Sequence, residues 1–225
     1  MELKRKHNIN MSLGSVHHYM KLLNIKSIVK IHKRHNFIKE QEEKSMFVYD
    51  NILNRNFKTD SPNKKWVTDI TYICLKDGRK YVSTIKDLYD NTIISYNISN
   101  YHDNDLVINT LQKGFEKVGY DKLDNLILHS DRGFQYLSKS YNIILNSYGI
   151  IGSHSRKGSP LDNAPIESFH STFKSECINQ NKRKTRKEIE EIIENWIEDY
   201  NNNRPQMKLN GLTPMEYRNK FVRFS

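Results

Sequence analysis

The apolar positions that follow residue 65 alternate with polar ones in the way that is typical of β-strands. Residues 66–75 alternate apolar, Thr and Tyr side chains, and residues 81–85 form a second run that would pair back on the first. Asp77-Gly78 lies between the two runs and is a strong hairpin signal. A third run covers residues 92–98. The pattern predicts a three-stranded antiparallel meander.

After the meander, helical periods alternate with short apolar runs. The elements expected are, in chain order, a helix over 103–118, a strand over 126–128, a helix over 138–147, a short strand at 150–151, a polar loop over 153–160, a helix that opens at Asp162 and a long helix that begins at Thr185. A meander followed by α/β crossovers predicts an α/β fold, with a mixed five-stranded sheet and helices on both of its faces.

The N-terminal part predicts one short helix over residues 12–23, because Val16, Met20 and Leu23 fall on one face of a 3.6-residue period. A short helix, a break at Asn24 and a dense basic tail are consistent with part of a helix-turn-helix. An amphipathic helix that enters no DNA groove fits the same pattern equally well.

The stretch over residues 39–60 is mostly polar and rich in Asn, which is typical of a connector. We therefore expect three parts. They are a small, basic, partly helix-turn-helix-like segment over 1–40, a linker over 41–59 and a sheet-containing catalytic domain over 60–222.

The charge of the chain indicates the kind of partner. The 225 residues include 36 Lys and Arg against 26 Asp and Glu, a net charge of +10. Residues 1–40 hold 9 basic and 2 acidic residues, and residues 204–225 hold 5 basic and 1 acidic residue. Basic ends beside a near-neutral middle favour a protein that binds phosphates of a nucleic acid. A merely solvated basic surface is the alternative.

The remaining composition restricts the cellular compartment. No apolar run approaches the roughly 18–20 residues that cross a bilayer, and the first residues are followed by no apolar signal core. Cys74 and Cys177 lie far apart and form neither a disulfide framework nor a zinc motif. We expect a cytoplasmic protein with no membrane partner, associated with the nucleoid when it binds DNA.

Three carboxylates are the candidates for chemistry. Asp69 interrupts an otherwise apolar and Thr-rich strand, where an unpaired charge is costly. Asp131 lies just past a buried strand, where ligand sites gather in α/β sheets. Glu167 lies in the first turns of a helix, beside its apolar stripe. A turn role for Asp131 and a helix-dipole role for Glu167 are ordinary alternatives, whereas Asp69 is the hardest of the three to explain in that way.

Three acids on neighbouring elements repel one another strongly without a cation. Hard divalent cations bind such clusters through oxygen, and two of them can activate an attacking oxygen and stabilise the leaving oxygen of a phosphodiester. The sequence contains no P-loop, HExxH or GxSxG motif. Metal-dependent phosphodiester chemistry is therefore favoured, and His129 beside the site either assists it or packs.

These residues lie in motifs that resemble the integrase-type transposases of the insertion-sequence three family, specifically the second reading frame. The matching segments are Trp66-Val67-Thr68-Asp69-Ile70-Thr71-Tyr72, His129-Ser130-Asp131-Arg132-Gly133-Phe134-Gln135-Tyr136, Ser155-Arg156-Lys157-Gly158-Ser159, Asp162-Asn163-Ala164, Glu167-Ser168-Phe169 with Lys174 and Glu176, and the tail with Tyr200-Asn201, Arg204 and Leu212-Thr213-Pro214. The 35 residues between Asp131 and Glu167 are the spacing that describes the family's Asp-Asp-Glu triad.

The resemblance implies a ribonuclease-H-like core in which Asp69, Asp131 and Glu167 are the catalytic metal ligands. They would bind two Mg²⁺ ions, for which Mn²⁺ would substitute. The partner would be double-stranded DNA, both element ends and target, on which the protein would act as a homo-oligomer. An upstream-frame DNA-binding protein is a further expected partner. The residues expected to contact DNA are Arg156, Lys157, Lys174 and Arg204.

Two alternatives to an active transposase are considered. One is a catalytically silent or truncated DNA-binding remnant of a decayed element, favoured by the short N-terminal segment and by His18 where relatives often have Arg. The other is a nuclease that acts on RNA–DNA hybrids, against which the Asp162-Asn163-Ala164 block and the Arg204 tail argue. The intact triad favours an active transposase, which performs metal-dependent cleavage and strand transfer.

Overall fold

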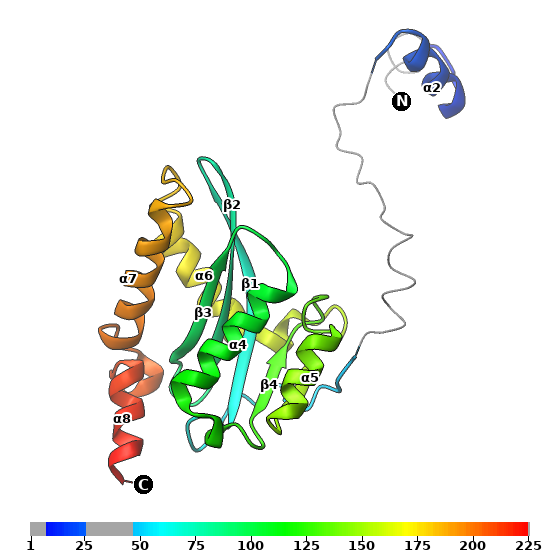
Figure 1. Ribbon diagram of the computed structural model, residues 1–225. Coiled ribbons are helices and arrows are strands. Elements are labelled where there is room, and N and C mark those ends of the chain that lie inside the picture. Colours follow the sequence, from blue (N-terminus) through cyan, green and yellow to red (C-terminus); the bar gives the residue numbers. More distant parts are fainter. Residues whose placement is uncertain (1–7, 26–46, 225) are drawn as a thin grey trace. The chain divides into compact units, whose positions relative to one another are not determined.

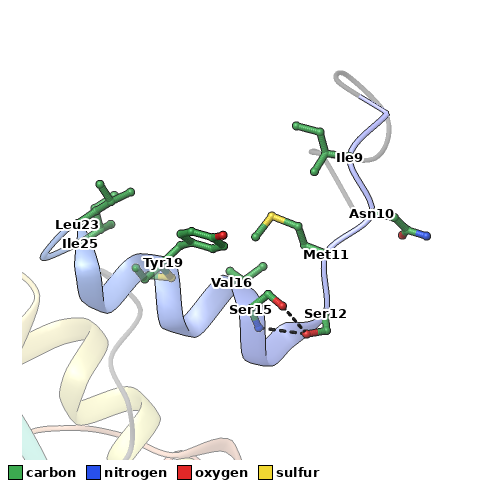
Figure 2. Close-up of a pocket in the computed structure, with 10 residues that line it drawn as sticks. Ile9, Asn10, Met11, Ser12, Ser15, Val16, Tyr19, Leu23 and Ile25 are labelled. Atoms are coloured by element: carbon green, nitrogen blue, oxygen red, sulfur yellow. Dashed lines mark hydrogen bonds between the residues drawn. The ribbon is translucent and has the colours of Figure 1, made fainter.

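The computed structural model describes residues 8–25 and 47–224, and the chain divides into two compact units after residue 41 (Figure 1). In the first unit, helix α2 spans Leu13–Leu22, and its N-cap Ser12 accepts a hydrogen bond from the Ser15 backbone N–H at 3.1 Å. This confirms the short helix predicted there. None of its residues is buried, and apolar side chains that include Val16 and Tyr19 line a shallow groove along it (Figure 2).

The second unit contains a five-stranded sheet, as predicted. Its strands are β1 (Lys65–Leu75), β2 (Gly78–Asp87), β3 (Ile93–Ser99), β4 (Ile127–Ser130) and β5 (Ile151–His154), in the order β3-β2-β1-β4-β5. The first three form the predicted antiparallel meander, whereas β4 and β5 pair in parallel with their neighbours. The sheet is therefore mixed, with the parallel part at one edge.

Helices cover both faces of this sheet (Figure 1). They are α4 (Asn104–Val118), α5 (Lys139–Ser147), α6 (Ala164–Phe173), α7 (Glu188–Asn202) and α8 (Pro214–Phe224). One core cluster joins Trp66 of β1 to the apolar faces of α4 and α5, and the other joins Val67 to α6 and α7. Successive residues of β1 thus supply opposite cores, as a strand covered on both faces requires. Among the described helices, none is long and apolar enough to cross a membrane.

Residues 47–59 differ from the expected linker, because they pack against the sheet domain. Leu53 is buried, and its backbone N–H donates to the Ser153 hydroxyl at 3.1 Å. The Tyr49 backbone N–H donates to His154 Nδ1 at 3.0 Å. Few apolar residues suffice for this packing, since backbone and polar groups supply the contacts. Ser153 and His154 belong to β5 through their parallel pairing with β4, where a polar loop was expected. The other limits of the predicted domains stay predictions.

The start of α6 also differs from the prediction. A 3₁₀ turn covers Pro160–Asn163, and α6 begins at Ala164, whereas the sequence pattern placed its opening at Asp162. The reason is that the Asp162 carboxylate does not cap the helix. It is buried and accepts hydrogen bonds from arginine side chains on other segments.

The second unit contains a buried pair of acids, Asp87 and Asp90, that contact α8. Asp87 and Asp90 are fully buried, and Arg218 of α8 donates to their carboxylates at 3.3 and 2.9 Å. Arg218 also donates to Asn63 Oδ1 at 2.6 Å. One side chain therefore fastens the last helix to the strand ends and turns of the sheet.

Candidate active site

The first candidate residue, Asp69, lies in β1 just beyond the point where β4 stops pairing with it. The β1–β4 ladder ends at Val67↔His129, so the next part of β1 borders the carboxyl end of β4. Asp69 Oδ1 accepts a hydrogen bond from the Ile70 N–H at 2.8 Å. Its side chain is 21% exposed, so it opens to solvent from within the sheet.

The second candidate residue, Asp131, directly follows β4. Its Oδ1 accepts a hydrogen bond from the Gly133 N–H at 2.8 Å, which holds the carboxylate across a tight turn. A Cβ at Gly133 would lie only 3.1 Å from that oxygen, so the turn favours glycine. Partial burial of the carboxylate, then the proximity of Asp69, raise the pKa of Asp131 above its usual range.

The third candidate residue, Glu167, lies in the first turn of α6 and is exposed. Desolvation raises the pKa of Glu167, and repulsion from Asp69 and from Asp131 raises it further. The structure thus brings together three acids from β1, from the end of β4 and from α6. They are near enough to affect one another's charge.

These acids are not a ready-made metal centre. Within residues 8–25 and 47–224, no group of three or more His, Cys, Asp or Glu side chains is placed so that it could hold a metal ion. The donor chemistry nevertheless fits a hard cation, because all three groups are carboxylates and their mutual repulsion is what a cation relieves.

His170 is a site residue that the sequence reasoning missed. It is buried on α6, one turn after Glu167, and its Nδ1 lies 3.3 Å from Asp69 Oδ2. Its Nε2 lies 2.8 Å from the Thr84 hydroxyl on β2. The His170 ring therefore contacts the Asp69 carboxylate of β1 and the Thr84 hydroxyl of β2, and so joins α6 to both strands. Its spacing of three residues from Glu167 was the available signal.

Asp162 fixes the loop that leads into α6. Its buried carboxylate accepts hydrogen bonds from Arg156 Nε at 2.8 Å, from Arg55 Nε at 2.7 Å and from Asn51 Nδ2 at 2.9 Å. These donors, with Arg156 first among them, hold the pKa of Asp162 well below its usual range. The ionised carboxylate thus ties the segment around residue 50 to the start of the helix that carries Glu167.

The four residues expected to contact DNA have different surroundings. The Arg156 guanidinium is paired with Asp162, although half of the side chain is exposed. Arg204 is paired with Glu176 through both of its terminal nitrogens. Lys157 is exposed in the loop before α6, and Lys174 Nζ lies 5.0 Å from the centre of the exposed Tyr72 ring. Lys157 and Lys174 are therefore the more available of the four. A DNA-binding role for each of them stays a prediction.

His129 packs, which was one of its two expected roles. It is fully buried, and its two ring nitrogens lie 2.9 Å from the Ser153 hydroxyl and 3.0 Å from the Ser155 hydroxyl. Burial lowers the pKa of His129 to about 4, so the ring is neutral at physiological pH. The His129 ring links β4 to β5 and to the residue that follows β5.

His154 makes the acid sensitivity of this junction testable. Burial lowers its pKa to about 4 from an ordinary 6.5. The unfolded chain binds a proton at a higher pH than the folded chain does, so the folded state loses stability as pH falls from 6.5 towards 4. The loss of folding free energy is up to about 3 kcal/mol.

We expect His154→Asn, which keeps an acceptor for the Tyr49 N–H but does not titrate, to gain stability relative to the wild type as pH falls from 6.5 towards 4. Urea unfolding at a series of pH values measures it, and parallel pH profiles would contradict the expectation.

The chain is similar in sequence and in fold to proteins that are already known. Residues 59–160 and 148–214 match two families that are each described as an integrase core domain. The catalytic core of HTLV-2 integrase, solved in complex with magnesium, superposes with a TM-score of 0.58 at 15% identity, over 72% of this chain and 99% of that one. The BIV integrase core gives a TM-score of 0.55, also at 15% identity. The fold is thus that of an integrase core.

The sequence relatives are more specific. The chain is 37% identical over 206 residues to the putative transposase InsK for insertion sequence element IS150 of Escherichia coli, covering 92% of this chain and 71% of that protein. It is 35% identical to a transposase-like protein of Haemophilus influenzae, covering 97% and 98% of the two chains. It is 34% identical to the transposase InsF for insertion sequence IS3A of E. coli, covering 77% of this chain and 60% of that one. The chain belongs to the insertion-sequence three family of transposases, which confirms the predicted family and fold class.

Proposed function

We propose that this transposase cleaves the ends of an insertion sequence and transfers them to target DNA, with Asp69, Asp131 and Glu167 as the ligands of two divalent ions, Mg²⁺ or its substitute Mn²⁺. The observation that carries the proposal is the convergence of three mutually repelling carboxylates from β1, from the end of β4 and from α6. Carboxylates that raise one another's pKa are costly to keep charged side by side unless they bind a cation.

The ions, when bound, supply Lewis acidity for the attacking and leaving oxygens of a phosphodiester. The chain's own residues supply the positions. His170 orients the Asp69 carboxylate, the Gly133 N–H orients that of Asp131, and Asp162 holds the loop that leads to Glu167. Such supporting contacts typically matter 10- to 100-fold for metal affinity or activity, as a rough guide.

The partner is double-stranded DNA, as element end and as target. The net charge of +10 supports this choice. We further propose that several copies act together on DNA, that an upstream-frame DNA-binding protein assists them and that the complex works at the nucleoid. The silent-remnant alternative is not favoured, because all three acids are present and two of them, Asp69 and Asp131, raise the pKa of the third.

The direct test is a strand-transfer assay with the purified chain, duplexes of the terminal sequences that flank its gene, and a plasmid target. We expect joined products with Mg²⁺ or Mn²⁺, and none after chelation with EDTA. Binding without cleavage or joining in either metal would support the silent remnant. Cleavage of RNA–DNA hybrids in preference to these duplexes would support the hybrid nuclease.

Lys174 gives a separate test of where DNA contacts the protein. It lies seven residues after Glu167, two turns along the same helical run, and is held beside the exposed Tyr72 ring. We expect Lys174→Ala to weaken duplex binding several-fold and to lower the salt dependence by about one phosphate contact. The measurement is a binding titration at several salt concentrations.

The matched control for Lys174 is Lys122→Ala, an exposed lysine that precedes β4 and so lies at the opposite end of that strand from Asp131. It removes the same charge from the chain. Equal losses for the two variants would mean that only net charge matters at position 174.

A further inference from the structure

Three aromatic rings from three separate segments meet beside the candidate active site. Tyr81 lies on β2, His102 lies between β3 and α4, and Phe134 lies in the loop after β4. The Tyr81 and His102 rings are stacked, with centroids 5.0 Å apart and planes 18° apart. The His102 and Phe134 rings meet edge to face at 5.6 Å. We call these three residues the aromatic platform.

The platform lies next to Asp131. Phe134 is three residues beyond it in the same turn, whose carboxylate is bonded to the Gly133 N–H. His102 is joined to this turn through its edge-to-face contact with Phe134. In the sheet β1 lies between β2 and β4, and the two ring contacts join Tyr81 of β2 to Phe134 after β4 through His102.

The platform is not part of the hydrophobic core. None of its three rings belongs to either core cluster of the described residues. Phe134 is 49% exposed, and His102 is exposed as well. One exposed ring alone would be ordinary, but three aromatic rings in mutual contact at the surface form a contiguous patch, which is typical of a binding site.

The position of the rings restricts what they bind. Phe134 is three residues from Asp131 in the same turn, so an occupant of the rings lies near a phosphodiester held at Asp131. Aromatic rings bind nucleobases by stacking, which is sequence-tolerant because every base has a π-face. A base inside a duplex has both faces covered by its neighbours, so only an unstacked base presents a free face.

We propose that Tyr81, His102 and Phe134 form a stacking site for an unpaired nucleobase of DNA, next to the phosphodiester that is cut or joined. The proposal rests on the proposed function, since it takes Asp131 as the site of the reaction. The base comes either from the element end, where strands separate around the cleaved bond, or from the target duplex. Both sources share the chemistry, and the experiment separates them.

The experiment measures binding in the absence of cleavage, with EDTA present, so that it does not depend on catalysis. Two probes each carry one 2-aminopurine, whose fluorescence reports stacking. In the first probe the base is an unpaired overhang at the element end, and in the second it lies opposite an abasic site inside a random duplex. A fully paired duplex of each sequence is the reference. The proteins compared are the full-length wild type, Phe134→Ala, His102→Ala and Phe134→Trp.

We expect Phe134→Ala and His102→Ala to weaken binding of one unpaired probe by roughly 10- to 100-fold, the range of one base–aromatic stack, and to abolish its fluorescence change. Paired duplexes should bind all variants equally, and Phe134→Trp should retain the unpaired probe. The probe that responds identifies the source of the base. Equal losses on paired and unpaired DNA, or no loss on either probe, would overturn the proposal.

A second aromatic cluster of the chain supplies the matched control. Tyr120 and Tyr148 are exposed and lie against Phe115 at the far end of α4, a helix of 15 residues and so about 22 Å long. His102 precedes the other end of this helix. Tyr120→Ala should leave every probe unaffected, and thermal unfolding of each variant checks the fold. If the wild type fails to cleave in Mg²⁺ while the stacking results hold, the proposed function fails and the base-binding site stands.

Discussion

Replacement of any one of the three acids, as Asp69→Asn, Asp131→Asn or Glu167→Gln, is expected to abolish metal-dependent cleavage. Each substitution keeps the shape of the side chain and removes a charge that a divalent ion requires. The loss of several kcal/mol of transition-state stabilisation corresponds to a rate lower by roughly a thousandfold or more. The measurement is cleavage of an end-sequence duplex in Mg²⁺, with DNA binding measured in parallel and expected to persist.

Stability measurements separate this loss from misfolding. The pKa values of Asp131 and Glu167 are raised by burial and by their neighbours, so the folded state holds these charges at a cost. Removing one charge should therefore leave the melting temperature unchanged or slightly higher. Asp105→Asn, an exposed acid in the first turn of α4, is the matched control and should cleave normally. Near-normal cleavage by a triad variant would remove that residue from the proposed ligand set.

The sequence predicted the parts of the molecule that depend on local patterns. The alternation of β1 and β2 and the apolar stripes of α4 and α7 follow from side-chain period alone. Asp69 was evident because a carboxylate in an apolar strand has no local explanation. Its neighbours in the strand also carried the family resemblance that the relatives confirm.

The sequence did not predict contacts between segments far apart in the chain. Arg156 looked like a free DNA ligand, yet its partner Asp162 also binds Arg55, more than 100 residues away in the chain. Leu53 lies in a polar stretch, and only the fold brings it under β5. His170 carried no signal of its own in the sequence, and only the fold places it against Asp69. Each of these three contacts depends on which helices, strands and loops lie next to one another in the fold. The periodicity of apolar residues along the chain carries no information on that arrangement.

The largest expected effect on stability is that of Arg218→Ala. Arg218 donates to both buried carboxylates, Asp87 and Asp90, and its own side chain is only 14% exposed. Buried Lys86 is a second cation near Asp90. Removing one partner of a buried pair leaves an uncompensated charge and typically costs about 3–5 kcal/mol. Burial, followed by repulsion from Asp90, already raises the pKa of Asp87 to about 6. We therefore expect the variant to unfold at much lower urea concentration than the wild type at pH 8.

The pH dependence of that loss identifies its cause. Without Arg218, the pKa of Asp87 rises further above its unfolded value, so the penalty of its charge is present at high pH and is relieved as pH falls and the carboxyl protonates. The stability difference between Arg218→Ala and the wild type should accordingly shrink between pH 8 and pH 5. Lys220→Ala, an exposed cation of the same helix, is the control and should cost little at either pH. A difference that stays constant with pH would mean that Arg218 acts through packing of α8, and not through the two buried acids.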